Sequence, residues 1–316
     1  MLNRRLLLLS GLVAGAGLSL PVFAQEKSAQ DRPAEGKLAV VASFSILADF
    51  VRAVGGERVA LTTLVGPDGD AHVYSPSPAD AKAMAAASLV VVNGLKFEGW
   101  LTRLLKSSGT KATLATATEG IAPLKMQDDG HGHGHSHGGE DPHAWQNVAN
   151  AKVYVANIQK ALSAADPAGK AHYEANAAAY LAKLDELEAE IRAAVSRIPA
   201  DRRKAITSHD AFAYFSKAYG IAFVAPQGVS TEAEASARDV GRIIRQVKAQ
   251  KVPAVFLENI SNPRLAEQIA RESGARIGGR LYSDALSGGD GPAGTYIAMM
   301  KHNISQIEKA LAAGPA

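Results

Sequence analysis

The 316-residue sequence contains no cysteine, and this absence sets the first limits on the protein. Without cysteine the chain forms no disulfide bonds, so its stability has to come from the size of its hydrophobic core. It also lacks the thiol that a lipid anchor or a thiolate metal site would need. The net charge is only +3, which excludes a strong field directed at nucleic acid or an anionic membrane surface. Hydrophobic residues make up 47% of the chain, enough for two ordinary domains.

Long apolar runs are missing everywhere except near the start of the chain. Arg4 and Arg5 precede an apolar stretch over Leu6–Leu20, which predicts a secretory signal peptide over residues 1–24 with cleavage after Ala24. The arginine pair is compatible with twin-arginine export, although the general route is favoured. We therefore expect a mature protein in the periplasm that diffuses freely and is not inserted in the membrane.

After a polar lead-in over residues 25–36, which we expect to be disordered, the chain alternates short β-branched runs with helical segments. This alternation occurs twice and predicts an α/β fold of two similar lobes, each with a parallel sheet. The expected strands are Leu38–Phe44, Val59–Val65, Leu89–Asn93, Ala112–Ala115, Lys204–Ser208, Ala222–Ala225, Ala254–Glu258 and Arg276–Leu281.

One long helix is expected between the lobes, over residues 168–198, because this stretch has no proline and carries apolar residues at spacings of three and four. The expected lobes then cover residues 37–167 and 199–316. In open α/β sheets ligands bind beyond the carboxyl ends of strands, so a site is expected in the cleft between the lobes.

Three histidines follow expected strands or lie in loops from both halves. His72 lies in a Gly/Pro/Asp-rich loop, His143 follows Pro142, and His209 comes directly after a strand. Singly, each is more simply a surface or hydrogen-bonded histidine. Together they favour a site for Zn²⁺, Cu²⁺ or Ni²⁺.

An anionic fourth ligand would complete a tetrahedron around such an ion. Asp284 and Asp290 both follow the last expected strand, and their positions do not decide between them. Glu258, at the end of another strand, is a candidate hydrogen-bond acceptor for a ligand imidazole. His172 and His302 lie in helical stretches and are expected at the surface.

Five ordered motifs resemble the zinc- and manganese-binding receptors of ABC importers, often called cluster A-I. They are GPDGDAHVYSPSPAD, NGLKFEGWL, DPHAW, TSHDAFAYF and LYSDALS. The resemblance covers essentially the whole mature chain and implies a binding protein rather than an enzyme, with an inner-membrane ABC permease as its partner.

Carried over by the resemblance, the metal ligands are His72, His143, His209 and Asp284. Manganese-type members tend to place a carboxylate where His209 stands, so Zn²⁺ is favoured over Mn²⁺. A monomer and a rigid linking helix are expected as well.

Four further histidines alternate with small residues in a loop over residues 128–140. His131, His133, His135 and His137 are predicted to hold metal transiently, because the glycines leave this segment without a fixed fold.

Two alternative functions remain at this point. A periplasmic zinc buffer or chaperone fits the same residues, and a secreted zinc hydrolase is less favoured because four protein ligands leave no open position for water.

We predict that deleting Asp129–Gly139 slows zinc capture or transfer but preserves tight binding, because ordering a flexible loop is costly. A zinc titration of the deletion variant checks this. Loss of the high-affinity site would contradict it.

Overall fold

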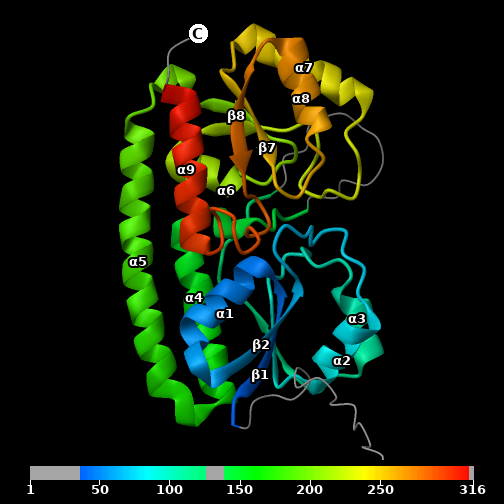
Figure 1. The fold of residues 1–316 in the computed structure, drawn as a ribbon, viewed down its shortest axis with the longest axis vertical. Coiled ribbons are helices and arrows are strands. Elements are labelled where there is room, and N and C mark those ends of the chain that lie inside the picture. Colours follow the sequence, from blue (N-terminus) through cyan, green and yellow to red (C-terminus); the bar gives the residue numbers. More distant parts are fainter. Residues whose placement is uncertain (1–35, 126–138, 313–316) are drawn as a thin grey trace, which may run out of the picture. The chain divides into compact units, whose positions relative to one another are not determined.

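Short β-branched and apolar runs form the strands of two four-stranded parallel sheets (Figure 1). The computed structural model describes residues 36–125 and 139–312, which lie within one compact unit. The signal peptide over 1–24, most of the lead-in over 25–36 and most of the His-rich loop fall outside these residues. None of the described helices combines the length and apolar character needed to cross a bilayer.

The first sheet has the strand order β2-β1-β3-β4. Its strands are β1 Leu38–Phe44, β2 Val59–Val65, β3 Leu89–Val92 and β4 Thr113–Thr116. The helices of this lobe are α1 Ser45–Gly55, α2 Pro78–Ala86 and α3 Leu101–Ser108. Ser77 starts α2 with a reciprocal cap, in which its side chain and that of Asp80 each accept a backbone N–H of the other.

The second sheet repeats this arrangement with the order β6-β5-β7-β8. Its strands are β5 Lys204–Ile206, β6 Ala222–Val224, β7 Ala254–Glu258 and β8 Arg276–Leu281. Its helices are α6 Ala213–Tyr219, α7 Ala237–Gln250, α8 Arg264–Ser273 and α9 Tyr296–Ala312. The expected fold class, two parallel-sheet α/β lobes, is confirmed.

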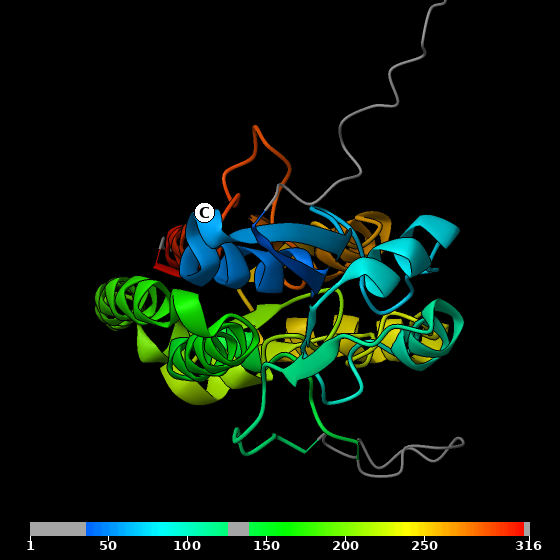
Figure 2. The same ribbon diagram turned by 90° about the horizontal axis from the view of Figure 1, so that it is seen from below.

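Two long helices connect the sheets, α4 Val148–Ala165 and α5 Lys170–Ser196. Helix α5 contacts α1 of the first lobe and α6 and α9 of the second, so it runs alongside both lobes (Figure 1). Figure 2 shows the green helices α4 and α5 beside the blue α1. The helix begins two residues later than expected, because Pro167–Gly169 form a 3-10 turn capped by the side chain of Asp166.

The hydrophobic core is continuous across both lobes instead of being divided into one core per lobe. One cluster joins Phe44 of β1 and Leu187 of α5 to Phe256 of β7 and Met299 of α9, all with their side chains buried. A second, smaller cluster lies beneath α7 and α8 and includes Ile243 and Ile269. The helices α4, α5 and α9 cause this continuity, because they supply apolar side chains on both sides of the junction.

Carboxyl ends of strands from both sheets face this junction. The loop after β2 carries His72, and His209 follows β5 by three residues. In the second sheet β5 and β7 are neighbours at the point where the strand order reverses, and β7 ends at Glu258. The fold therefore brings loops that are far apart in the sequence to one place.

Candidate metal site

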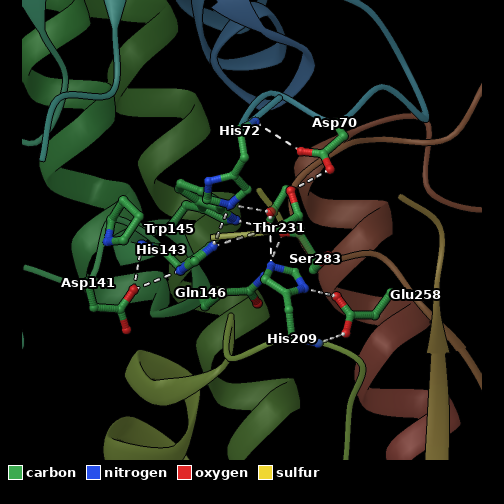
Figure 3. Close-up of polar contacts among 12 residues, drawn as sticks. Asp70, His72, Asp141, His143, Trp145, Gln146, His209, Thr231, Glu258 and Ser283 are labelled. Atoms are coloured by element: carbon green, nitrogen blue, oxygen red, sulfur yellow. Dashed lines mark hydrogen bonds and ion pairs between the residues drawn. The ribbon is translucent and has the colours of Figure 1, made fainter. Parts of the chain in front are cut away.

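Four buried side chains converge at the junction of the lobes: His72, His143, His209 and Asp284. Each offers one possible ligand atom, and these four atoms lie within 4.8 Å of one another. They come from four separate loops of the chain, as Figure 3 shows for the three imidazoles. Within the described residues these four form the group suited to a metal ion.

Three of the distances between ligand atoms in this cluster match the edges of a metal tetrahedron. The Nε2 atom of His72 lies 3.3 Å from Nε2 of His143 and 3.1 Å from Oδ2 of Asp284. Nε2 of His209 lies 3.1 Å from the same Oδ2 atom. Zinc bonds of about 2.0–2.1 Å at tetrahedral angles place ligand atoms about 3.3 Å apart. An ion therefore fits among these atoms with little rearrangement.

His72 and His143 are positioned by the same local device, an aspartate two residues earlier. Asp70 Oδ1 accepts the backbone N–H of His72 at 2.9 Å, and Asp141 Oδ1 accepts that of His143 at 2.9 Å. Asp141 Oδ1 also lies 2.8 Å from Nδ1 of His143. A proton held on Nδ1 leaves the Nε2 lone pair of His143 free to bind metal.

His209 is held by Glu258 from the neighbouring strand. Glu258 Oε1 accepts the backbone N–H groups of Ser208 and His209, at 2.6 and 2.9 Å, and Oε2 lies 2.6 Å from Nδ1 of His209. The role considered for Glu258 from its position at a strand end thus has a geometric basis. Two of the three imidazoles therefore have a carboxylate behind them (Figure 3).

Asp284 follows β8 of the second lobe, but its loop is fastened mainly to the first. Trp145 Nε1 and Gln146 Nε2 both donate to the carbonyl of Ser283, at 2.9 and 2.8 Å. Two residues beyond Asp284, the N–H of Leu286 donates to Ser45 Oγ, and its carbonyl accepts the N–H of Asp68. These bonds fix the carboxylate beside the imidazoles of His72 and His143.

Burial and mutual attraction together set the protonation of the site. Burial by itself raises the pKa of Asp284, but the attraction of His143 and His209 outweighs it and holds this pKa well below its usual range. For His143, burial lowers the pKa, yet Asp284 and Asp141 together raise it to about 9. For His209, burial has the same lowering effect, and Glu258 and Asp284 raise the pKa well above its usual value. Without metal, the Asp284 carboxylate is stabilised by protonated imidazoles.

One carboxylate oxygen in the cluster has no hydrogen-bond partner among the described residues. Asp284 Oδ1 is buried and its nearest cationic group, Nε2 of His143, is 3.5 Å away. A buried, ionised oxygen without a hydrogen bond is costly unless a cation compensates it. This oxygen and its neighbour Oδ2 face the position where an ion would be bound.

The other residues considered from the sequence lie elsewhere. Asp290 is exposed in the loop beyond Asp284 and takes no part in the cluster. His172 is exposed on α5, and His302 on α9 lies 3.0 Å from the carbonyl of Arg280. The histidines of the glycine-rich loop fall outside the described residues; they are His131, His133, His135 and His137.

Apart from Glu258, sequence reasoning missed the residues that support the ligands. The signal for two of them is the repeated pattern Asp-x-His, present at Asp70–His72 and Asp141–His143. Asp and Asn side chains commonly accept a backbone N–H two residues on. Ser45 and Gln146, in contrast, act on Asp284 from far away in the sequence and have no local signature.

Comparisons with known proteins agree with this geometry. The family described as "ZnuA: Zinc-uptake complex component A periplasmic" matches residues 40–310. The chain is 34% identical over 273 residues to the iron-binding protein YfeA of Yersinia pestis, covering 86% of each chain. It is 31% identical over 308 residues to the manganese ABC transporter substrate-binding lipoprotein PsaA of Streptococcus pneumoniae, covering 96% of this chain and 98% of PsaA.

A solved structure has a similar fold. The periplasmic zinc binding protein TroA from Treponema pallidum superimposes with a TM-score of 0.81 at 31% identity, over 88% of this chain and all of TroA. These relatives are solute-binding proteins and not enzymes.

We expect metal affinity to keep rising with pH up to about 9. The pKa of His143 is raised to about 9, so at neutral pH its imidazole must lose a proton before Nε2 can bind metal. The pKa of His209 is raised as well, so each pH unit below that value costs at least about tenfold in apparent affinity. Competition titrations against a zinc chelator from pH 6 to 8.5 measure this slope. An affinity that levels off above pH 6.5, the ordinary histidine range, would contradict it.

Replacing Glu258 with Gln should weaken metal binding about 10- to 100-fold. The Gln amide would present an N–H to Nδ1 of His209, which forces the imidazole proton onto Nε2, the ligand atom. Equilibrium zinc titration measures the loss, and Asp290→Asn in the exposed loop is the control. Equal affinities for the two variants would show that Glu258 does not orient His209.

Proposed function

Because the chain belongs to the family of periplasmic zinc-uptake components, we propose that it is a periplasmic receptor that captures Zn²⁺ for an ABC-type membrane importer. In this proposal Zn²⁺ is cargo, and its ligands are His72, His143, His209 and Asp284. The observation that carries the proposal is the convergence of these four buried side chains from separate loops. Membership of the family gives the membrane permease as the partner.

The donor set favours zinc over the other metals named for the relatives, which include iron, manganese and zinc. Three imidazole nitrogens and one carboxylate oxygen form a nitrogen-rich site. Carboxylate and carbonyl oxygens suit Mn²⁺, whereas imidazole suits Zn²⁺. The raised proton affinity of the imidazoles at His143 and His209 adds a cost that a weakly nitrogen-binding ion such as Mn²⁺ overcomes less readily.

The number of protein ligands supports a protein that binds the zinc ion without catalysing a reaction. A catalytic zinc keeps one position for water, but four protein ligands fill a tetrahedron. The four side chains are at most 7% exposed, which leaves a bound ion shielded from solvent. Such a site retains its ion until part of the structure moves, as a carrier requires.

Release to a permease then requires that contacts across the junction be broken. Thr231 Oγ1 donates to Asp70 Oδ2 at 2.6 Å, and Asn259 Nδ2 donates to Asp68 Oδ1 at 3.1 Å, each joining the two lobes. Unlike the buried bonds that hold Ser283 and Leu286 to the first lobe, these two bonds are partly or fully exposed. Docking on a permease would replace them and let His209 move away from the other three ligands. The His-rich loop is proposed to hold zinc transiently before transfer.

A competition between metals tests the proposed cargo. Metal-free protein equilibrated with equal Zn²⁺, Mn²⁺ and Fe²⁺ should retain one zinc per chain, measured by elemental analysis. His209→Glu replaces a nitrogen ligand by an oxygen ligand and should lower the zinc-to-manganese ratio of affinities at least about tenfold. Retention of manganese or iron by the unchanged protein would contradict zinc as cargo.

Growth of a deletion strain distinguishes a transport receptor from a periplasmic zinc buffer. A strain lacking the protein should fail to grow when zinc is chelated and recover when zinc is added. Normal growth of that strain under chelation would favour storage over transport.

A further inference from the structure

A cavity of about 370 Å³ lies beside the loop between β6 and α7, and residues that adjoin the metal site form part of its lining. Asp70 and Ser208 line it from one side, and Thr231 and Glu234 from that loop. Asp70 is two residues before His72, and Ser208 directly precedes His209. The cavity therefore touches the chain next to one ligand from each lobe. We call it the vestibule.

The mixed lining of the vestibule includes hydroxyl groups without a hydrogen-bond partner among the described residues. Ser208 is only 3% exposed and its hydroxyl has no hydrogen-bond partner among the described atoms. The hydroxyl of Ser261, also in the lining, is likewise unpartnered within the described chain. A buried hydroxyl without a protein partner can hydrogen-bond to water or to a hydrated ligand. At about 30 Å³ per water, the volume holds about a dozen waters, enough for a cation with its six-water shell.

The charges of the vestibule favour a cation. Its ionisable residues are the carboxylates of Asp70 and Glu234 and the guanidinium of Arg264. Asp70 uses Oδ1 to hold the backbone of His72 and Oδ2 to accept the hydroxyl of Thr231 (Figure 3). The loop of Thr231 and Glu234 is thus fastened directly to the segment that carries His72.

A second cavity, of about 700 Å³, also lies next to residues that adjoin the ligands. Asp141 and Asp210 line it, but so do three cations, Lys125, Lys217 and Arg242. These cations repel a divalent ion, so the two cavities differ in the sign of their lining charge. The vestibule is the one suited to a positive ion.

We propose that hydrated Zn²⁺ first occupies the vestibule, held through its water shell by Asp70 and Glu234, and from there passes to His72 and His209. This inference rests on the proposed function, since it describes how zinc reaches the same four ligands. A site on the path of the ion should change the rates of binding and release together and leave the equilibrium nearly unchanged.

Stopped-flow measurement of zinc association and dissociation tests this, with Glu234→Gln and Glu234→Lys as variants. Glu234 is exposed and takes no part in the ligand cluster, so these variants should fold normally. The matched control is Glu232→Lys, which changes an exposed charge on the same loop outside the vestibule.

The association rate constant should fall about threefold for Glu234→Gln and more than tenfold for Glu234→Lys at low salt, with the dissociation rate constant falling in parallel. This decrease in the rate constants should largely disappear at 1 M salt, where charges are screened within about 3 Å. The control should retain most of the original rate.

Unchanged rate constants for Glu234→Lys, or an effect equal to that of Glu232→Lys, would overturn the proposed role of the vestibule in zinc entry. A faster dissociation with weakened equilibrium binding would also overturn it, because that result indicates a structural role. Failure of the unchanged protein to bind zinc at equilibrium would overturn the proposed function itself, and this is measured first.

Discussion

The structure of the site depends on how the negative charge of a buried carboxylate is compensated. Asp284 is fully buried at the junction of two lobes, and three imidazoles lie within contact distance of it. An isolated ionised carboxylate in such a place costs several kcal/mol, even after relaxation of the surroundings. Protons on the imidazoles of His143 and His209 compensate this charge in the absence of metal, and a divalent cation would do so in their place. In the proposed function, metal binding is therefore an exchange of protons for an ion within a preformed set of charges.

The fold makes this exchange possible by holding the ligands before the ion arrives. Asp70, Asp141 and Glu258 orient the three histidines, while Ser45 and the side chains of the Trp145–Gln146 turn fix the loop of Asp284. The continuous core beneath the junction limits how far these loops can move. A rigid set of nitrogen-rich ligands selects an ion by geometry and donor type, in addition to its overall affinity. Because the core is rigid, the polar contacts that can break on release are the exposed or partly exposed ones between the lobes, from Thr231 to Asp70 and from Asn259 to Asp68.

Much of the fold could be predicted from local patterns. Runs such as Leu38–Phe44 and Ala254–Glu258 are buried parallel strands, whose apolar, β-branched composition is visible in the sequence. The strands at Leu89 and Lys204 end one and two residues earlier than expected, because tertiary contacts and not composition end them. The continuity of the core could not be predicted, since it depends on which faces of α4, α5 and α9 pack together.

The candidate site was predictable to a similar degree. Residues in strand-following loops, such as His72 and His209, could be proposed from position and chemistry. The choice of Asp284 over Asp290 rests on the resemblance to a family, because only five residues of loop separate them and the sequence alone allows either to reach a cleft. In the structure the bonds to Ser283 and Leu286 hold Asp284 in place. Contacts of this kind, between residues more than a hundred positions apart, leave no pattern in a single sequence.

The central claim is that one zinc ion is bound jointly by three imidazoles and one carboxylate. X-ray absorption spectroscopy of the zinc-loaded protein tests it directly, because scattering from imidazole rings is distinct from that of oxygen ligands. The account predicts a four-coordinate zinc with three imidazole nitrogens and one oxygen, at about 2.0–2.2 Å. A zinc with fewer than three imidazoles, or one surrounded mainly by water oxygens, would contradict it.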